Sequence, residues 1–370
     1  MKAKKIIILP VLLMFVFCLF LSPSAITAQE KKKEDKTKGQ IIIPKEVKVI
    51  LQEGIAQRQG RLDIPFAFIK HLYLPAQLNM HSIFLFKMKN MDLGFVPQAF
   101  DVIEQKTAEE KTEEKKTETP PAPETETPPV LLQADLHVFL QFHRLEESAP
   151  VEVIKEVYIP VKIQVESTSY DPEKEEIYIT AYPLPPGEYL LAMAVTSPDI
   201  KKIGTQYYEF SLPDSSLFTE TMETTPLFFI KSYKQMSAPE TTAEVHKDFF
   251  TYSILQIEPK IDNVFPQGED LDIFFYIYGI QPNEENQFDI GVNYEVSQEE
   301  ENIIRFEPIN YPSPLVSQPL PMKRTFRITS EEGEKSERRD LDPGQYTLSI
   351  KIKDNISGKS LDKKIDFEIK

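Results

Sequence analysis

Apart from its acids, this chain has few side chains that could carry catalysis or hold a metal ion: five histidines and one cysteine, against 58 acidic residues. His137 and His143 are separated by an even number of positions, which places them on one face of a strand. At about 3.3 Å per residue they would lie about 20 Å apart, too far to share a metal ion. We interpret them as solvent-facing strand histidines.

The sequence signatures of the common enzyme classes are missing. There is no Gly-x-Ser-x-Gly elbow, no phosphate-cradling glycine loop and no His-Glu-x-x-His motif. Among 58 acids many pairs could by chance suit glycoside hydrolysis, so a carboxylate pair alone has little weight. We therefore expect no catalytic residues and no cofactor.

Two weaker candidates for binding lie in the second half of the chain. Asp262, Asp270 and Asp272 gather at an acidic turn and could bind calcium through oxygen ligands, but they lack the spacing of a known calcium loop. A solvated turn is the simpler interpretation.

Three aromatic residues alternate along one strand and so share a face: Phe274, Tyr276 and Tyr278. If exposed, they could bind a glycan or a peptide. Aromatic rows are also routine in sandwich cores, and core packing is the preferred interpretation.

A segment that occurs twice indicates which elements would position these residues. LPPGEY at 184–189 recurs as LDPGQY at 341–346, and the alternating apolar residues that follow match without a gap. Each copy predicts a tight turn, a strand, a polar turn and a closing strand. This is the last hairpin of a β-sandwich, so we expect two such modules.

The turn residues of the repeat have specific roles. Proline fixes φ at one turn position and glycine supplies a positive φ at the next, which predicts type II turns. The repeated structural residues are Pro186, Gly187 and Tyr189 in the first copy and Pro343, Gly344 and Tyr346 in the second. Each tyrosine forms either a tyrosine corner, with its hydroxyl bonded to the main chain, or a core tyrosine with a solvated hydroxyl.

Alternating segments elsewhere predict an all-β protein of tandem antiparallel Ig-like β-sandwiches. The first module spans 40–212, with strands expected at 47–51, 64–73 and 83–88, and the second spans 248–370. Residues 213–247 are predicted to be a linker with room for one strand.

Residues 104–129 consist of Glu, Lys, Thr, Pro and Ala, apart from one glutamine, and cannot bury enough apolar area to fold. This flexible acidic segment is either an insertion within the first module, as a disordered loop, or a linker between two domains. Loop closure entropy grows slowly with length, which favours the insertion.

The first residues predict export. Lysines precede an apolar run from Ile6 to Leu21, and small residues follow up to Ala28. The run is shorter than the roughly 20 residues that span a bilayer. We expect a cleavable signal peptide at 1–28, with an uncleaved anchor as the alternative, then a disordered tail at 29–39. Cys18 lies inside the signal, so the exported chain would be free of cysteine and would not stay inserted in the membrane.

One resemblance supports this picture. The motifs Ile257-Glu258-Pro259 and 264–271 (VFPQGEDL), followed by 341–369, resemble Ig-like accessory modules of secreted bacterial proteins, such as those appended to von Willebrand A-type and GWxTD-domain proteins. The domains that name those families are missing, since the chain has no tryptophan and no Asp-x-Ser-x-Ser site. The resemblance implies a noncatalytic sandwich and transfers no functional residues.

These observations predict a periplasmic or secreted protein that acts as a structural, adhesion or protein-binding module. With a net charge of −16 it would repel nucleic acid, and we expect protein partners. The alternative is a glycan-binding or carbohydrate-active protein.

Overall fold

The fold is known from a computed structural model, which describes residues 43–98, 130–214, 221–330 and 333–370. These residues hold one α-helix, α1 (Lys45–Gln57), two short 3₁₀ helices (Asn90–Leu93 and Ser167–Ser169) and sheets whose strands are mostly antiparallel. The predicted all-β class is confirmed. The predicted signal peptide, tail and acidic segment lie outside the described residues.

No helix within the described ranges combines the length and the apolar character needed to cross a membrane.

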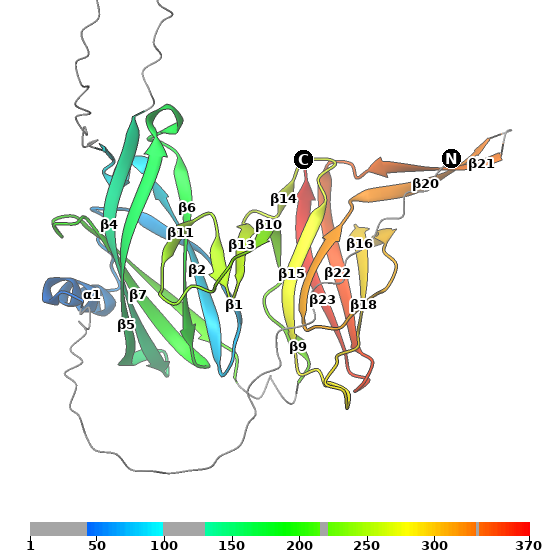
Figure 1. The fold of residues 1–370 in the computed structure, drawn as a ribbon, viewed down its shortest axis with the longest axis horizontal. Coiled ribbons are helices and arrows are strands. Elements are labelled where there is room, and N and C mark those ends of the chain that lie inside the picture. The colour runs from blue at the N-terminus through cyan, green and yellow to red at the C-terminus, as the bar shows by residue number, and fades with distance from the viewer. Residues whose placement is uncertain (1–42, 99–129, 215–220, 331–332) are drawn as a thin grey trace, which may run out of the picture. The chain divides into compact units, whose positions relative to one another are not determined.

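Two sheets form the first sandwich (Figure 1). The first sheet has the order β5 (Ala149–Glu166), β4 (Leu131–Glu146), β7 (Gly187–Thr196) and β8 (Ile203–Leu212), and β3 (Val96–Pro97) also pairs with β4. The second sheet has the order β1 (Phe66–Ala76), β2 (Asn79–Lys89), β6 (Glu175–Leu184) and β11 (Val245–Lys247).

Two further sheets form the second sandwich, and a separate hairpin lies between two of their strands in the chain. The third sheet has the order β12 (Phe250–Tyr252), β13 (Leu255–Lys260), β10 (Phe228–Gln235), β15 (Leu271–Tyr278) and β19 (Leu315–Leu320), with β9 (Glu223–Thr224) at the end of β15. The fourth has the order β14 (Val264–Phe265), β23 (Ser360–Ile369), β22 (Gly344–Asp354), β16 (Ile290–Gln298) and β17 (Glu301–Arg305), with β18 (Ile309–Tyr311) on β16. The strands β20 (Lys323–Ser330) and β21 (Gly333–Asp340) pair only with each other.

Three apolar layers hold the four sheets together. The first core, between the first and second sheets, includes Phe84, Phe86, Phe142, Tyr189 and Leu191. The middle core, between the second and third sheets, includes Leu72, Leu85, Ile179, Phe228 and Phe274. The last core, between the third and fourth sheets, includes Phe229, Phe275, Tyr294, Leu348 and Ile350. The second and third sheets are therefore buried on both faces, which is why Ile83–Phe86 are all fully buried in succession.

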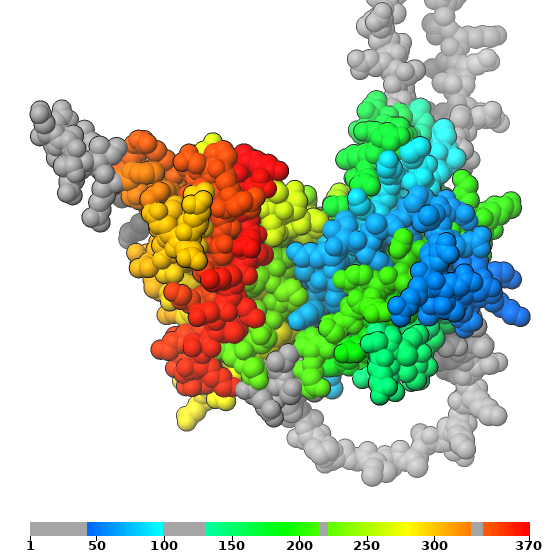
Figure 2. All heavy atoms as spheres, turned by 180° about the vertical axis from the view of Figure 1, so that it is seen from behind, coloured from blue at the N-terminus to red at the C-terminus, as the bar shows by residue number. Residues whose placement is uncertain are grey.

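The predicted strand at 47–51 is wrong, because these residues belong to helix α1. Its buried residues Val47, Leu51 and Gly54 follow a spacing of four and three, which is that of one helix face. This face packs on Phe139 and Ala192 of the first sheet. In Figure 2 the blue segment that contains α1 lies against green strands of this sheet.

Residues 213–247, predicted to be a linker, instead supply three strands to two sheets. β9 and β10 join the third sheet, whereas β11 pairs with β6 of the second, with His246 opposite Ile179. The chain returns to the third sheet at β12. The physical reason is burial, since Phe228 packs in the middle core and Phe229 in the last.

The repeat has the predicted environment in both copies. The hydroxyl of Tyr189 donates to the carbonyl of Pro185 at 2.7 Å, and that of Tyr346 to the carbonyl of Asp342 at 2.8 Å. The tyrosine corner is confirmed in both. The type II turn is wrong, because φ is 149° at Gly187 and 158° at Gly344, far above the ~80° of that turn.

Candidate binding site

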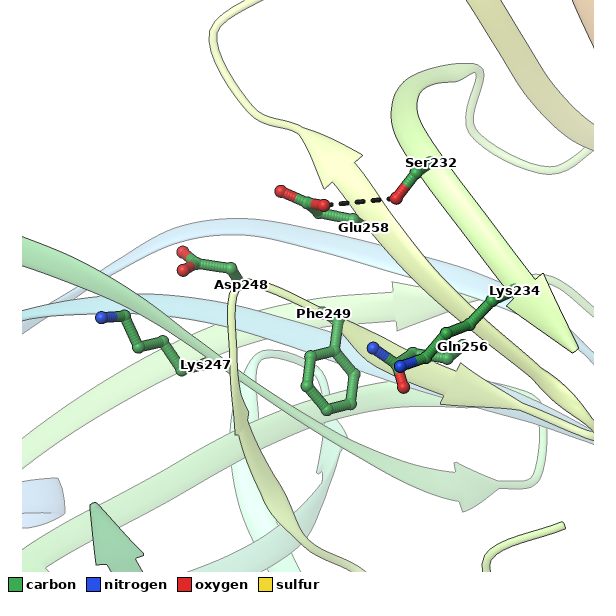
Figure 3. A pocket seen from close by; sticks show the side chains of 7 residues that line it. All are labelled: Ser232, Lys234, Lys247, Asp248, Phe249, Gln256 and Glu258. Atoms are coloured by element: carbon green, nitrogen blue, oxygen red, sulfur yellow. Dashed lines mark hydrogen bonds between the residues drawn. The ribbon is translucent and has the colours of Figure 1, made fainter. Parts of the chain in front are cut away.

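A pocket of about 390 Å³ lies where the chain passes from β11 to β12, beside β10 and β13 (Figure 3). It is lined by Ser232, Lys234, Lys247, Asp248, Phe249, Gln256 and Glu258. Strand alternation explains part of this lining: Ser232 and Lys234 come from one face of β10, and Gln256 and Glu258 from one face of β13. The two pairs are cross-strand neighbours in register.

Charges of both signs line this pocket, and most are already paired. Glu258 accepts hydrogen bonds from Lys231 at 3.0 Å and from the Ser232 hydroxyl at 3.3 Å. Lys247 forms an ion pair with Glu176 at 3.0 Å. Burial raises the pKa of Asp248 above its usual range. Lys234 has no ion-pair partner among the described residues, so the pocket retains one unpaired cation beside a partly buried acid.

The lining combines charged, amide, hydroxyl and aromatic groups. The Ser232 hydroxyl donates a hydrogen bond to the carboxylate of Glu258. The Phe249 ring and the polar groups around it can hold a polar ligand that offers both donors and acceptors. The sequence did not suggest this site, because its residues straddle the predicted linker and the next module.

A second surface is the outer edge of β5. This 18-residue strand pairs with β4 along one side only within the described residues. Val151 and Val153 on it are 60% and 40% exposed. An edge with unpaired main-chain groups and exposed apolar side chains can accept another strand.

The structure does not bring the calcium candidates together. Asp262 caps a turn by accepting a hydrogen bond from the Val264 amide at 3.2 Å. Asp272 accepts one from the Ser317 hydroxyl at 3.2 Å, and burial raises its pKa. Asp270 is exposed. Among the described residues, the group whose ligand atoms lie close enough to hold a metal is a different one, Glu240, Glu244 and His246.

The aromatic row on β15 is packed in the protein, not displayed as a platform. Phe274 is 1% exposed and Tyr278 is 2% exposed, and Tyr276 is half-buried. The Tyr278 hydroxyl lies 3.5 Å from the sulfur of Met80 on β2. Core packing was the preferred interpretation, and it describes Phe274 and Tyr278.

The interpretation of the histidine pair as solvent-facing is wrong for His143, which is 7% exposed. The alternation of β4 holds, but its outer face is covered, because Phe139 on that face packs against helix α1 and Gln141 beside it is 1% exposed. His137 is half-buried, and its Nδ1 lies 2.8 Å from the Tyr158 hydroxyl. Neither histidine belongs to the group of possible metal ligands among the described residues.

Comparison with known proteins gives no family for this chain: no family model matches it, and no curated protein matches it either.

Proposed function

We propose that this chain is an exported, noncatalytic protein of two fused Ig-like β-sandwiches that binds another protein through the edge of β5. The single observation that carries the binding role is this long outer strand with its exposed valines. The Ig-like fold is inferred from the strand order, and export is inferred from the sequence.

Strand order supports the Ig-like assignment. In the first sandwich β5-β4-β7-β8 face β1-β2-β6, and in the second β17-β16-β22-β23-β14 face β10-β15-β19. The two orders correspond strand for strand, apart from β14, which pairs in parallel with β23. The tyrosine corner falls at the same place in both, at the third residue of the strand that follows the crossover between sheets.

The connection through residues 99–129 supports the insertion rather than the linker. Val96 and Pro97, which precede it, pair with Gln133 and Leu132, which follow it. Residues from both sides of the segment also pack in the first core. The acidic segment then belongs to a loop between neighbouring strands of one sandwich. The apolar start of the chain supports export to the periplasm or beyond.

Pro160 sets one limit of the binding edge. Proline has no amide hydrogen, and within sheets it is confined to edge strands and bulges. A strand added to β5 would therefore pair on the amino-terminal side of Pro160, along Val151–Ile159. This stretch includes both exposed valines, and its charges, such as Lys155, are those with which natural edges limit unwanted pairing. The expected partner is an extended segment of another exported protein.

The test is recovery of a partner from the native envelope with a double variant, Val151→Glu and Val153→Glu. Buried carboxylates would disfavour strand addition, so we expect the partner to be lost while the far-UV spectrum and melting temperature stay unchanged. Leu78→Glu is the matched control, because Leu78 is 88% exposed on the turn between β1 and β2. Equal recovery by wild type and the double variant would refute the edge, and specific glycan binding without a protein partner would refute the protein-binding role.

A further inference from the structure

Three metal-ligating side chains converge just before and within β11. Glu240, Glu244 and His246 each offer a ligand atom, and these atoms all lie within 4.8 Å of one another. We infer that they form a binding site for a divalent transition-metal ion of the zinc type. The inference is independent of the proposed protein-binding edge, which lies on β5.

The separations suit such an ion. Zinc bonds to nitrogen and oxygen of about 2.0–2.1 Å place tetrahedral ligand atoms roughly 3.3 Å apart. His246 Nε2 lies 3.0 Å from Glu240 Oε2, so these two atoms already have nearly the spacing of ligands on one ion. Glu244 offers a carboxylate oxygen within 4.8 Å of both atoms.

All three side chains also line one cavity. This pocket, of about 290 Å³, has His81, Tyr182 and Thr251 on its other walls. An ion held by the three ligands would therefore face a pocket with room for water in the remaining positions, which is the arrangement of three-ligand zinc sites. That the three side chains line a pocket does not follow from their spacing, so the two features support the site independently.

Neighbouring groups fix two of the ligands. The Thr251 hydroxyl donates to Glu240 Oε2 at 2.7 Å. The Phe249 ring stacks on His246 with centroids 4.3 Å apart and planes at 22°. Contacts of this kind hold ligands in orientation and strengthen metal sites.

The negative charge of the site has no cation to balance it. Within the described part of the chain, no lysine or arginine forms an ion pair with Glu240 or Glu244. Lys247, the next residue after His246, is instead paired with Glu176 at 3.0 Å. Two carboxylates and an imidazole thus line the pocket together.

The donor set also selects the ion. Calcium and magnesium bind oxygen almost exclusively, whereas imidazole suits zinc and its neighbours in the first transition row. The site spans the point where the chain leaves the third sheet, adds β11 to the second and returns. A bound ion would therefore tie the residues before β11 to β11 itself, and would stabilise the junction of the two sandwiches.

The test is zinc binding to the exported chain without a histidine tag, by competition with a chromogenic chelator and by melting temperature. We expect one equivalent of zinc to bind, an increase of several degrees in melting temperature, and no such effect of calcium at the same concentration. Glu244→Gln and His246→Gln should each weaken zinc binding at least tenfold. Glu244 is exposed, so its variant should fold normally without metal.

Glu146→Gln and His137→Gln are the controls, because they remove one exposed acid and one histidine on β4, away from the site, and both should bind zinc as the wild type does. The inference is overturned if the wild type binds no zinc stoichiometrically, if Glu244→Gln binds as tightly as the wild type, or if calcium competes equally, which would indicate a nonspecific acidic surface.

Discussion

Phe274 of β15 packs against Phe228 of β10 with ring centroids 5.3 Å apart, in the layer that joins the two sandwiches. Both rings are 1% exposed. The same layer receives Leu85 and Ile179 from the second sheet. Because the second and third sheets both bury apolar side chains in this layer, unfolding either sheet would expose the apolar face of the other, and we expect them to unfold together.

The first prediction follows from this contact. Wild-type protein should unfold in a single thermal transition, and Phe274→Ala should reduce the free energy of unfolding by about 3–5 kcal/mol, as large core truncations do. Calorimetry and denaturant titration measure both. Tyr233→Ala is the control, because Tyr233 on β10 is 52% exposed and its replacement should reduce the free energy of unfolding only slightly. Two separate transitions in the wild type would contradict the shared core.

The second prediction concerns the two tyrosine corners. Tyr189→Phe and Tyr346→Phe keep the ring but remove the hydroxyl that bonds to Pro185 and Asp342. Each should lower the free energy of unfolding by about 1 kcal/mol, the usual net value of one hydrogen bond. The corners share no partner, so the double variant should lose the sum of the two. A marked departure from additivity in denaturant titrations would show that the corners are coupled.

The third prediction tests helix α1. Leu51→Ala removes a fully buried side chain that packs on the outer face of the first sheet, and should cost about 2–5 kcal/mol. Val49→Ala on the same helix is the control, because Val49 is 42% exposed. Urea unfolding curves distinguish the two. Equal costs would mean that α1 does not dock by the face that the structure gives it.

The fourth prediction concerns pH. His71 stacks between Phe84 and Phe210, at centroid distances of 4.9 and 4.7 Å, and its Nε2 is buried without a hydrogen-bond partner in the described residues. Burial lowers the pKa of His71 to about 4, from an ordinary value of about 6.5. Between these values the unfolded chain binds a proton that the folded chain does not, so stability is complete above pH 6.5 and decreases as the pH falls to about 4.

The measurement compares the wild type with His71→Phe between pH 7.5 and 4. The wild type should lose about 3 kcal/mol more than the variant across this range, at 1.36 kcal/mol per pKa unit. Comparing two chains cancels the other titrating groups, among them His143, whose pKa burial also lowers. Parallel pH profiles would show that the His71 ring is accessible to protonation in the folded state.

Prediction from sequence succeeded where one face of a strand meets a core and the other meets water. On β22, Tyr346, Leu348 and Ile350 are buried and the residues between them are not, as the alternation predicted. It failed at α1, where a short apolar run resembles a strand and Pro44 before the helix makes no side-chain capping bond that would mark its start.

The candidate sites were harder to predict, because they depend on which distant segments meet. His143 looked exposed from its spacing alone, but helix α1 packs on the face of β4 that carries Phe139 and His143. A period-two pattern does not reveal the middle core, because strands that are buried on both faces have continuous apolar sequences. Glu240 and His246 lie in a stretch whose composition resembles a linker, and only the pairing of β11 with β6 places them in a pocket.

The passage of the chain from β10 to β11 and back to β12 has a consequence for biosynthesis. β6 is made well before its outer neighbour β11, so the second sheet remains unfinished until Lys247 has emerged from the ribosome. The apolar face that carries Leu72, Leu85 and Ile179 stays uncovered still longer, until β13 and β15 have been synthesised. The amino-terminal half therefore exposes this apolar face, and can aggregate through it, while the carboxy-terminal half is translated. The two halves complete their folding together.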